Sequence, residues 1–163
     1  MRPAHKVAAG SAIVLAICAF VTPSEGIVTR AYRDPAGILT LCIGETEGVK
    51  EGDVKTPAEC RAMLAQRIPD YLYAVDSLMP GLPDNRRIAY TDFAYNLGPG
   101  KLTLRRKDKY ERPIPGTSIV DLERAGNWRA ACQRMGLFVY AGKVKLAGLV
   151  KRRNKEVKLC LSS

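Results

Sequence analysis

Two acidic residues, Glu25 and Asp34, and the turn that begins at Asp34 constrain the fold of this chain more than any other feature. Glu25 precedes a glycine, and Asp34 opens a strong turn signal at residues 34–37 that β-forming residues follow. We expect Glu25 to lie at or near a helix end, with Asp34 and Thr40 on a hairpin folded against it. Two carboxylates in different surroundings are the minimum equipment for cleaving a glycosidic bond. An ordinary turn aspartate and a solvated glutamate would show the same spacing.

The composition narrows the class of partner. The chain has 163 residues, enough for one domain with a sizeable core or for two small lobes that share a helix. Its net charge of +10 favours an anionic partner, which could be nucleic acid, anionic lipid or an acidic envelope polymer. A single histidine, His5, argues against histidine-based nucleophilic catalysis and histidine-rich metal sites.

Five cysteines make an odd number and form no CxxC pair, which argues against a zinc site. Reduced cysteines of a cytosolic protein and partly disulfide-bonded cysteines of an exported protein both remain possible from the count alone. The amino-terminal segment favours the exported protein.

Residues 7–24 carry no charge and follow a basic start, which predicts a membrane-directed segment. Three interpretations compete: a cleaved secretory signal, a lipoprotein signal at Cys18, and an uncleaved, weakly hydrophobic anchor that later leaves the bilayer. Ile17 is bulky for a lipoprotein signal, and small-residue cleavage sites are weak. Because Glu25 follows at once, the anchored state would keep the acid at the membrane surface. We therefore favour the releasable anchor, with the basic end cytoplasmic and the remainder periplasmic.

Residues 31–46 are predicted to form a short β-hairpin or a three-stranded ribbon, and helices follow. Thr56 and Glu59 form a capping-box pattern that begins a helix reaching Met79, which Pro69 should kink or divide. A strongly basic segment follows at residues 101–112. Further helices are expected at residues 84–97, 118–125, 127–135 and 146–161.

The pattern Glu-x8-Asp-x5-Thr at residues 25–40 resembles the active-site signature of the phage lysozyme family, glycoside hydrolase family 24. It is most similar to phage endolysins that carry an amino-terminal signal-anchor segment. Softer matches lie in three later runs, and the resemblance extends from about residue 7 to residue 160. These runs are residues 93–98, 125–132 and 148–160.

The resemblance implies an α+β, lysozyme-like fold in which a long helix joins a small β-hairpin lobe to a larger, mainly helical lobe. Residues 1–24 would form the signal anchor, and residues 25–163 the catalytic domain. In the family, the anchored protein is inactive at the host inner membrane and acts in the periplasm after release.

The resemblance also implies a muramidase that hydrolyses the β-1,4 bond between N-acetylmuramic acid and N-acetylglucosamine in peptidoglycan. Glu25 would be the general acid, Asp34 would orient water or stabilise the transition state, and Thr40 would help to position that water. Such an enzyme needs no cofactor or metal, would act as a monomer and would not bind nucleic acid. A lytic transglycosylase and a non-catalytic, membrane-tethered binding module are the alternatives.

Supporting roles follow from the same resemblance. Thr46, Tyr95 and Asn96 would contact glycan, although a core tyrosine and a capping asparagine explain the last two equally well. Arg152 or Arg153 would pair with Glu25. Glu45 stands where relatives often have histidine, and we expect it to form a salt bridge.

Four cysteines lie where relatives of the anchor type have cysteines, which implies the pairs Cys42–Cys60 and Cys132–Cys160. Cys18 is then the odd thiol. Because Thr40 and Cys42 lie two residues apart on one strand face, attack by Cys18 on a bond involving Cys42 would change the active site.

Overall fold

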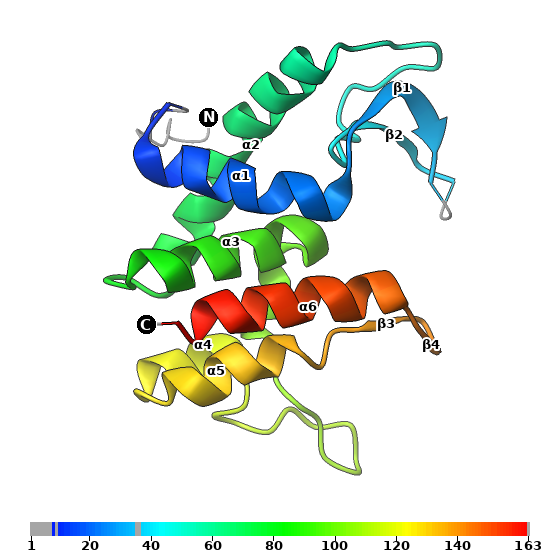
Figure 1. Ribbon diagram of the computed structural model, residues 1–163. Helices are drawn as coiled ribbons and strands as arrows, with labels where there is room; N and C mark the ends of the chain where they lie inside the picture. The colour runs from blue at the N-terminus through cyan, green and yellow to red at the C-terminus, as the bar shows by residue number, and fades with distance from the viewer. Residues whose placement is uncertain (1–7, 9, 35–36, 163) are drawn as a thin grey trace. The chain divides into compact units, whose positions relative to one another are not determined.

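We describe a computed structural model of the chain that covers residues 8, 10–34 and 37–162, without the side chain of Glu25. The chain divides into two compact units, Met1–Pro69 and Asp70–Ser163. The fold is α+β, as the sequence predicts: helices predominate, and each unit holds one small two-stranded sheet (Figure 1).

The first unit begins with helix α1, Ala12–Glu25, within the predicted anchor segment. The buried side chains Val14, Ile17 and Val21 are spaced three and four residues apart, so they share one face of this helix. No helix among the described residues is both long and apolar enough to cross a membrane. Most of the predicted anchor before residue 10 lies outside the described residues.

Strands β1, Val28–Arg33, and β2, Leu39–Cys42, form the predicted antiparallel hairpin. Tyr32 pairs with Thr40, and the register shifts between Val28 and Tyr32. A third segment joins the sheet edge through a single bridge between Arg30 and Val54. Residues 35–36 of the turn lie outside the described residues.

Helix α2, Pro57–Leu78, starts with the predicted capping box, in which Thr56 and Glu59 exchange hydrogen bonds of 2.7 and 3.2 Å. Of the two outcomes expected at Pro69, a kink or a division of the helix, the structure excludes the division, because α2 continues through this residue. Proline removes one backbone donor, but α2 has buried apolar residues on both sides of it, and their burial offsets that loss. These residues are Leu64, Ile68, Leu72 and Val75.

The second unit contains the remaining elements. They are α3, Asp84–Leu97; η1, Pro99–Thr103; α4, Ile119–Arg124; α5, Trp128–Met135; β3, Tyr140–Ala141; β4, Val144–Lys145; and α6, Ala147–Cys160. Helices α3 and α6 lie side by side (Figure 1). Their buried residues join those of η1, α4 and α5 in one hydrophobic core that includes Tyr90, Phe93, Leu102 and Met135.

The predicted helix boundaries agree with local capping signals. Gly98 ends α3 at φ +84°, a conformation that glycine adopts without a side-chain penalty. Ser118 caps α4 through a capping box with Asp121. The short β3–β4 hairpin before α6 was not predicted, because two-residue strands carry no periodic signal.

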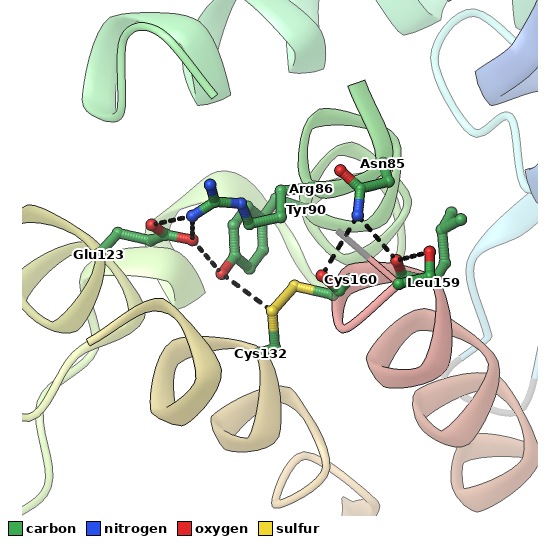
Figure 2. The surroundings of a disulfide bond; sticks show 8 residues. Asn85, Arg86, Tyr90, Glu123, Cys132, Leu159 and Cys160 are labelled. Atoms are coloured by element: carbon green, nitrogen blue, oxygen red, sulfur yellow. Dashed lines mark hydrogen bonds and ion pairs between the residues drawn. A yellow bond between two sulfur atoms is a disulfide. The ribbon is translucent and has the colours of Figure 1, made fainter. Parts of the chain in front are cut away.

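A disulfide between Cys132 and Cys160 joins α5 to the end of α6 (Figure 2). Asn85 of α3 donates hydrogen bonds to the carbonyl oxygens of Leu159 and Cys160, at 3.1 and 3.4 Å. Beside the disulfide, the hydroxyl of Tyr90 donates to Glu123 at 2.7 Å. These contacts fix the carboxyl-terminal end of α6 within its unit.

Candidate active site

Glu25 is the last residue of α1, at the helix end where the sequence predicts it. Gly26 follows at φ +73°, and its N–H donates to the carbonyl oxygen of Thr22 at 3.1 Å. Strand β1 begins at Val28, two residues later. The backbone therefore turns sharply from helix to strand at the predicted general acid, whose side chain lies outside the described part of the chain.

Asp34 closes the hairpin. Its carboxylate accepts a hydrogen bond from the N–H of Ile38 at 2.8 Å, and its carbonyl oxygen accepts one from the N–H of Gly37 at 2.8 Å. An aspartate that bonds its own turn in this way holds its side chain in one orientation. The turn role and the proposed catalytic role are compatible, since the hydrogen bond from Ile38 uses only the Oδ1 atom of the carboxylate.

Thr40 lies on the opposite arm of the same hairpin and is only 5% exposed. Its hydroxyl donates to the carbonyl oxygen of Ile38 at 3.1 Å. A threonine hydroxyl has one donor and two acceptor lone pairs. With the proton committed to Ile38, this hydroxyl oxygen is left as an acceptor, which suits the orientation of a water molecule.

The end of β2 is fixed by a disulfide between Cys42 and Cys60, a pair that the resemblance implies. Cys42 has φ +60°, an uncommon value for a residue other than glycine. Cys18 of α1 carries the free thiol, which is partly buried. Burial raises the pKa of the Cys18 thiol, so the reactive thiolate is disfavoured in this structure.

Glu45 forms the expected salt bridge, to Arg67 at 3.2 Å. Its carboxylate also accepts the backbone N–H groups of Thr46 and Glu47, at 3.1 and 3.0 Å. Arg67 pairs in addition with Glu47 at 2.8 Å. These three charged residues border a surface hollow of about 290 Å³, and the exposed Thr46 lies beside it in sequence.

In the second unit, Tyr95 and Asn96 are half-buried at the end of α3. The ring of Tyr95 meets that of Tyr71 edge to face, with centroids 5.2 Å apart. The Oδ1 atom of Asn96 accepts a hydrogen bond from Arg153 at 2.9 Å. Both side chains therefore have structural partners within their own unit, and glycan contact stays a prediction for them.

Arg152 and Arg153 of α6 are buried in one network of charged side chains. Arg153 is fully buried, donates to Glu156 at 2.6 Å, and lies 4.8 Å from the centroid of the Phe93 ring. Arg152 donates to Asp92 of α3 and lies 3.4 Å from Glu156. This network holds both guanidinium groups in place, whereas the predicted pairing of either one with Glu25 stays a prediction.

The sequence reasoning missed Asp92 and gave Glu156 no role, although Glu156 is part of the quoted run on α6. The spacing could have predicted a salt bridge for Glu156, because it lies four and three residues after Arg152 and Arg153 on one helix. Nothing local marks Asp92. It faces α6 only because α3 and α6 pack together.

Burial, and after it the nearby negative charge of Asp92, raise the pKa of Glu156 to about 9, although the two arginines oppose the shift. One oxygen of each carboxyl group, Oδ2 of Asp92 and Oε2 of Glu156, has no hydrogen-bond donor among the described residues. A proton on Glu156 supplies that donor. We conclude that Glu156 is neutral at pH 7 in the folded protein.

The candidate residues thus fall into two groups. Glu25, Asp34, Thr40 and Thr46 belong to the first unit, and Tyr95, Asn96, Arg152 and Arg153 belong to the second. Within the described residues, no cluster of three or more His, Cys, Asp or Glu side chains is arranged to hold a metal ion.

Comparison with known proteins shows which class of protein this chain belongs to. The SAR-endolysin of Pseudomonas phage phiKMV is 34% identical over 158 residues, covering 96% of this chain and 92% of that protein. The crystal structure of the active form of P1 phage endolysin matches with a TM-score of 0.78 and 30% identity, over 90% of this chain and 83% of that one. The secreted inactive form of the same endolysin matches with a TM-score of 0.52 and 32% identity, over 71% and 74%.

These likenesses establish a lysozyme-like fold, and the protein is a glycoside hydrolase. The family profile described as phage lysozyme matches residues 22–156. The chain belongs to the phage lysozyme family.

Proposed function

We propose that this protein is an endolysin that hydrolyses the β-1,4 bond between N-acetylmuramic acid and N-acetylglucosamine in bacterial peptidoglycan. Its membership of the phage lysozyme family carries this proposal. The hairpin geometry supports it, because Asp34 and Thr40 occupy opposite arms of one fixed turn that follows α1 directly.

In the proposed mechanism, Glu25 donates a proton to the glycosidic oxygen as the bond breaks. Asp34 stays ionised and either orients the attacking water or stabilises positive charge on the sugar. Thr40 accepts a hydrogen bond from that water, because its own hydroxyl proton is donated to the carbonyl oxygen of Ile38. The reaction inverts the anomeric centre, as the family resemblance implies, and an inverting pair of carboxyl groups lies about 6.5–9.5 Å apart.

A zymogram on purified peptidoglycan tests the assignment of the acid. Glu25→Gln removes the proton donor and should abolish clearing. Glu51→Gln, an exposed glutamate of the same unit, is the matched control and should clear normally. Substantial clearing by Glu25→Gln would contradict the assignment. Product analysis separates hydrolysis, which leaves a reducing sugar, from transglycosylation, which leaves an anhydro end.

We also propose that residues 7–24 anchor the protein transiently in the host inner membrane and that the released protein acts in the periplasm as a monomer. The SAR-endolysin relatives support this topology. The closer likeness to the active form of P1 endolysin than to its inactive form supports assignment of the described fold to the released protein. With Cys18 free and Cys42 bonded to Cys60, this structure would precede the thiol exchange proposed next.

Cys18 is the proposed regulatory thiol of this transition. While the anchor is in the bilayer, the thiol is protected, and on release it can attack a disulfide that involves Cys42. The thiolate would form a new bond to one sulfur and expel the other as a thiolate, so no external oxidant is needed. A Cys18→Ser variant that stays regulated and lyses cells on the normal schedule would rule this out.

A further inference from the structure

A hollow of about 310 Å³ opens on the second unit between the basic loop after η1 and helix α5. Two arginines line it, Arg106 from the loop and Arg134 from α5. The other lining residues are uncharged, and they include the polar side chains Thr117 and Gln133 and the apolar side chain Leu137.

Three neighbouring cations of the loop have carboxylate partners, and a fourth, Lys109, lies over the ring of Tyr110. The ion pairs are Arg105–Asp121 at 2.8 Å, Lys107–Glu111 at 2.9 Å and Arg112–Asp108 at 2.8 Å. Among the described residues, by contrast, neither Arg106 nor Arg134 has a carboxylate within ion-pair distance. The two arginines at the hollow thus differ from Arg105, Lys107 and Arg112, which each have a carboxylate partner.

Arg134 is only partly satisfied by the protein. Its Nη2 atom donates to the carbonyl oxygen of Leu104 at 3.3 Å, but its Nε atom is buried and has no hydrogen-bond partner among the described residues. Burial lowers the pKa of Arg134, and the positive charge of Arg106 lowers it further. The guanidinium group of Arg134 also lies 5.9 Å from the centroid of the Phe138 ring. Two arginines without a carboxylate partner therefore line one hollow, and a bound anion would relieve the repulsion between them and accept a hydrogen bond from the Nε–H of Arg134.

We propose that this hollow is a binding site for a phosphomonoester group. Two guanidinium groups carry a charge of +2, which a phosphate dianion matches and a single carboxylate does not. Planar guanidinium groups also suit the oxygens of phosphate, since each can donate two parallel hydrogen bonds. Leu137 gives the organic part of the ester an apolar wall. None of its lining residues is a proposed catalytic or glycan-contacting residue, and the proposal does not depend on the muramidase assignment.

Isothermal titration calorimetry of the full chain with inorganic phosphate and with sulfate tests the site. Wild type should bind both at pH 7.5. At pH 5 phosphate should bind about tenfold more weakly, because inorganic phosphate is then a monoanion whereas at pH 7.5 the dianion is its main form; sulfate stays a dianion, so its binding should not fall. Arg106→Gln and Arg134→Gln should each weaken phosphate binding about tenfold or more.

Lys109→Gln and Arg129→Gln are the matched controls. Each removes one positive charge from the same loop or the same helix, at side chains that lie over Tyr110 and Trp128 and do not line the hollow. Both should bind phosphate as wild type does. If Arg134→Gln fails to fold for want of its bond to Leu104, the exposed Arg106 still provides the test.

A second arm identifies the source of the phosphate. Co-sedimentation with phosphatidylcholine vesicles containing phosphatidic acid, lost in Arg106→Gln but kept in Lys109→Gln, would indicate a lipid headgroup. Binding of inorganic phosphate alone, with the same dependence on variants, would indicate a soluble ester. Equal binding by all four variants, or no phosphate binding by wild type, would overturn the proposal.

Discussion

Replacing Glu156 with glutamine tests the protonation state of the buried network on α6. Glu156 is fully buried and accepts from Arg153 at 2.6 Å, and its second oxygen faces Asp92 without a donor. Glutamine keeps the acceptor for Arg153 and supplies an N–H for Asp92. It therefore reproduces the neutral acid, and we expect Glu156→Gln to fold with wild-type stability or better at pH 7.

The pH dependence gives this prediction its sign and size. Folding raises the pKa of Glu156 from 4.5 to about 9, so the folded state holds the proton more tightly than the unfolded state. The stability that this proton contributes is fully present below pH 4.5 and is lost as the pH rises toward 9. One pH unit corresponds to about 1.4 kcal/mol, so wild type should lose about 3 kcal/mol relative to Glu156→Gln between pH 5 and pH 7.

Urea unfolding at pH 5, 6, 7 and 8, with both disulfides intact, measures the difference. Trp128, the single tryptophan, lies half-buried in the second unit and reports on that unit by its fluorescence. Glu156→Ala is the contrasting variant: it leaves Arg153 without the hydrogen-bond acceptor of Glu156 and should cost about 1.5–3 kcal/mol, as loss of a hydrogen bond to a charged group does. A constant difference between wild type and Glu156→Gln from pH 5 to pH 8 would refute a neutral Glu156.

Three further predictions use the same unfolding assay. Asp121→Asn should destabilise the protein at pH 7 by about 1 kcal/mol, since it weakens a helix cap and the ion pair with Arg105. Because these contacts lower the pKa of Asp121, that loss should shrink as the pH falls below 4, and a loss that grows there would contradict the account. Cys132→Ser with Cys160→Ser opens a link across 28 residues and should cost about 3–4 kcal/mol; an unchanged urea midpoint would contradict it. Gly98→Ala should cost about 1 kcal/mol from its positive φ alone, because no atom lies within 4 Å of the added carbon; a neutral result would show that the turn relaxes.

Much of the local structure could be predicted from residues close together in sequence. Asp84–Leu97 was predicted to the residue because a proline-rich break precedes it and Gly98 ends it. Thr56 with Glu59 marked the start of α2, and the turn at residues 34–37 marked the hairpin. Each of these signals acts over three or four residues, so it is readable without knowledge of the fold.

The continuation of α2 through Pro69 shows where local rules fail. Proline weakens a helix wherever it occurs, but burial of apolar residues before and after it depends on the rest of the protein. The β3–β4 hairpin was missed for a related reason. Its strands have two residues each, too few to show an alternating pattern, and they exist because α6 begins directly after them.

By itself, the sequence determined the family, the capped helices and the acidic signature at Glu25 and Asp34, because each of these depends on motifs of residues close together in the chain. Only the tertiary structure decided the protonation state of Glu156, since its raised pKa comes from burial and from Asp92, 64 positions away in the chain. The same holds for the hollow between Arg106 and Arg134. Charges interact through space, and which of them meet without a partner is a property of packing.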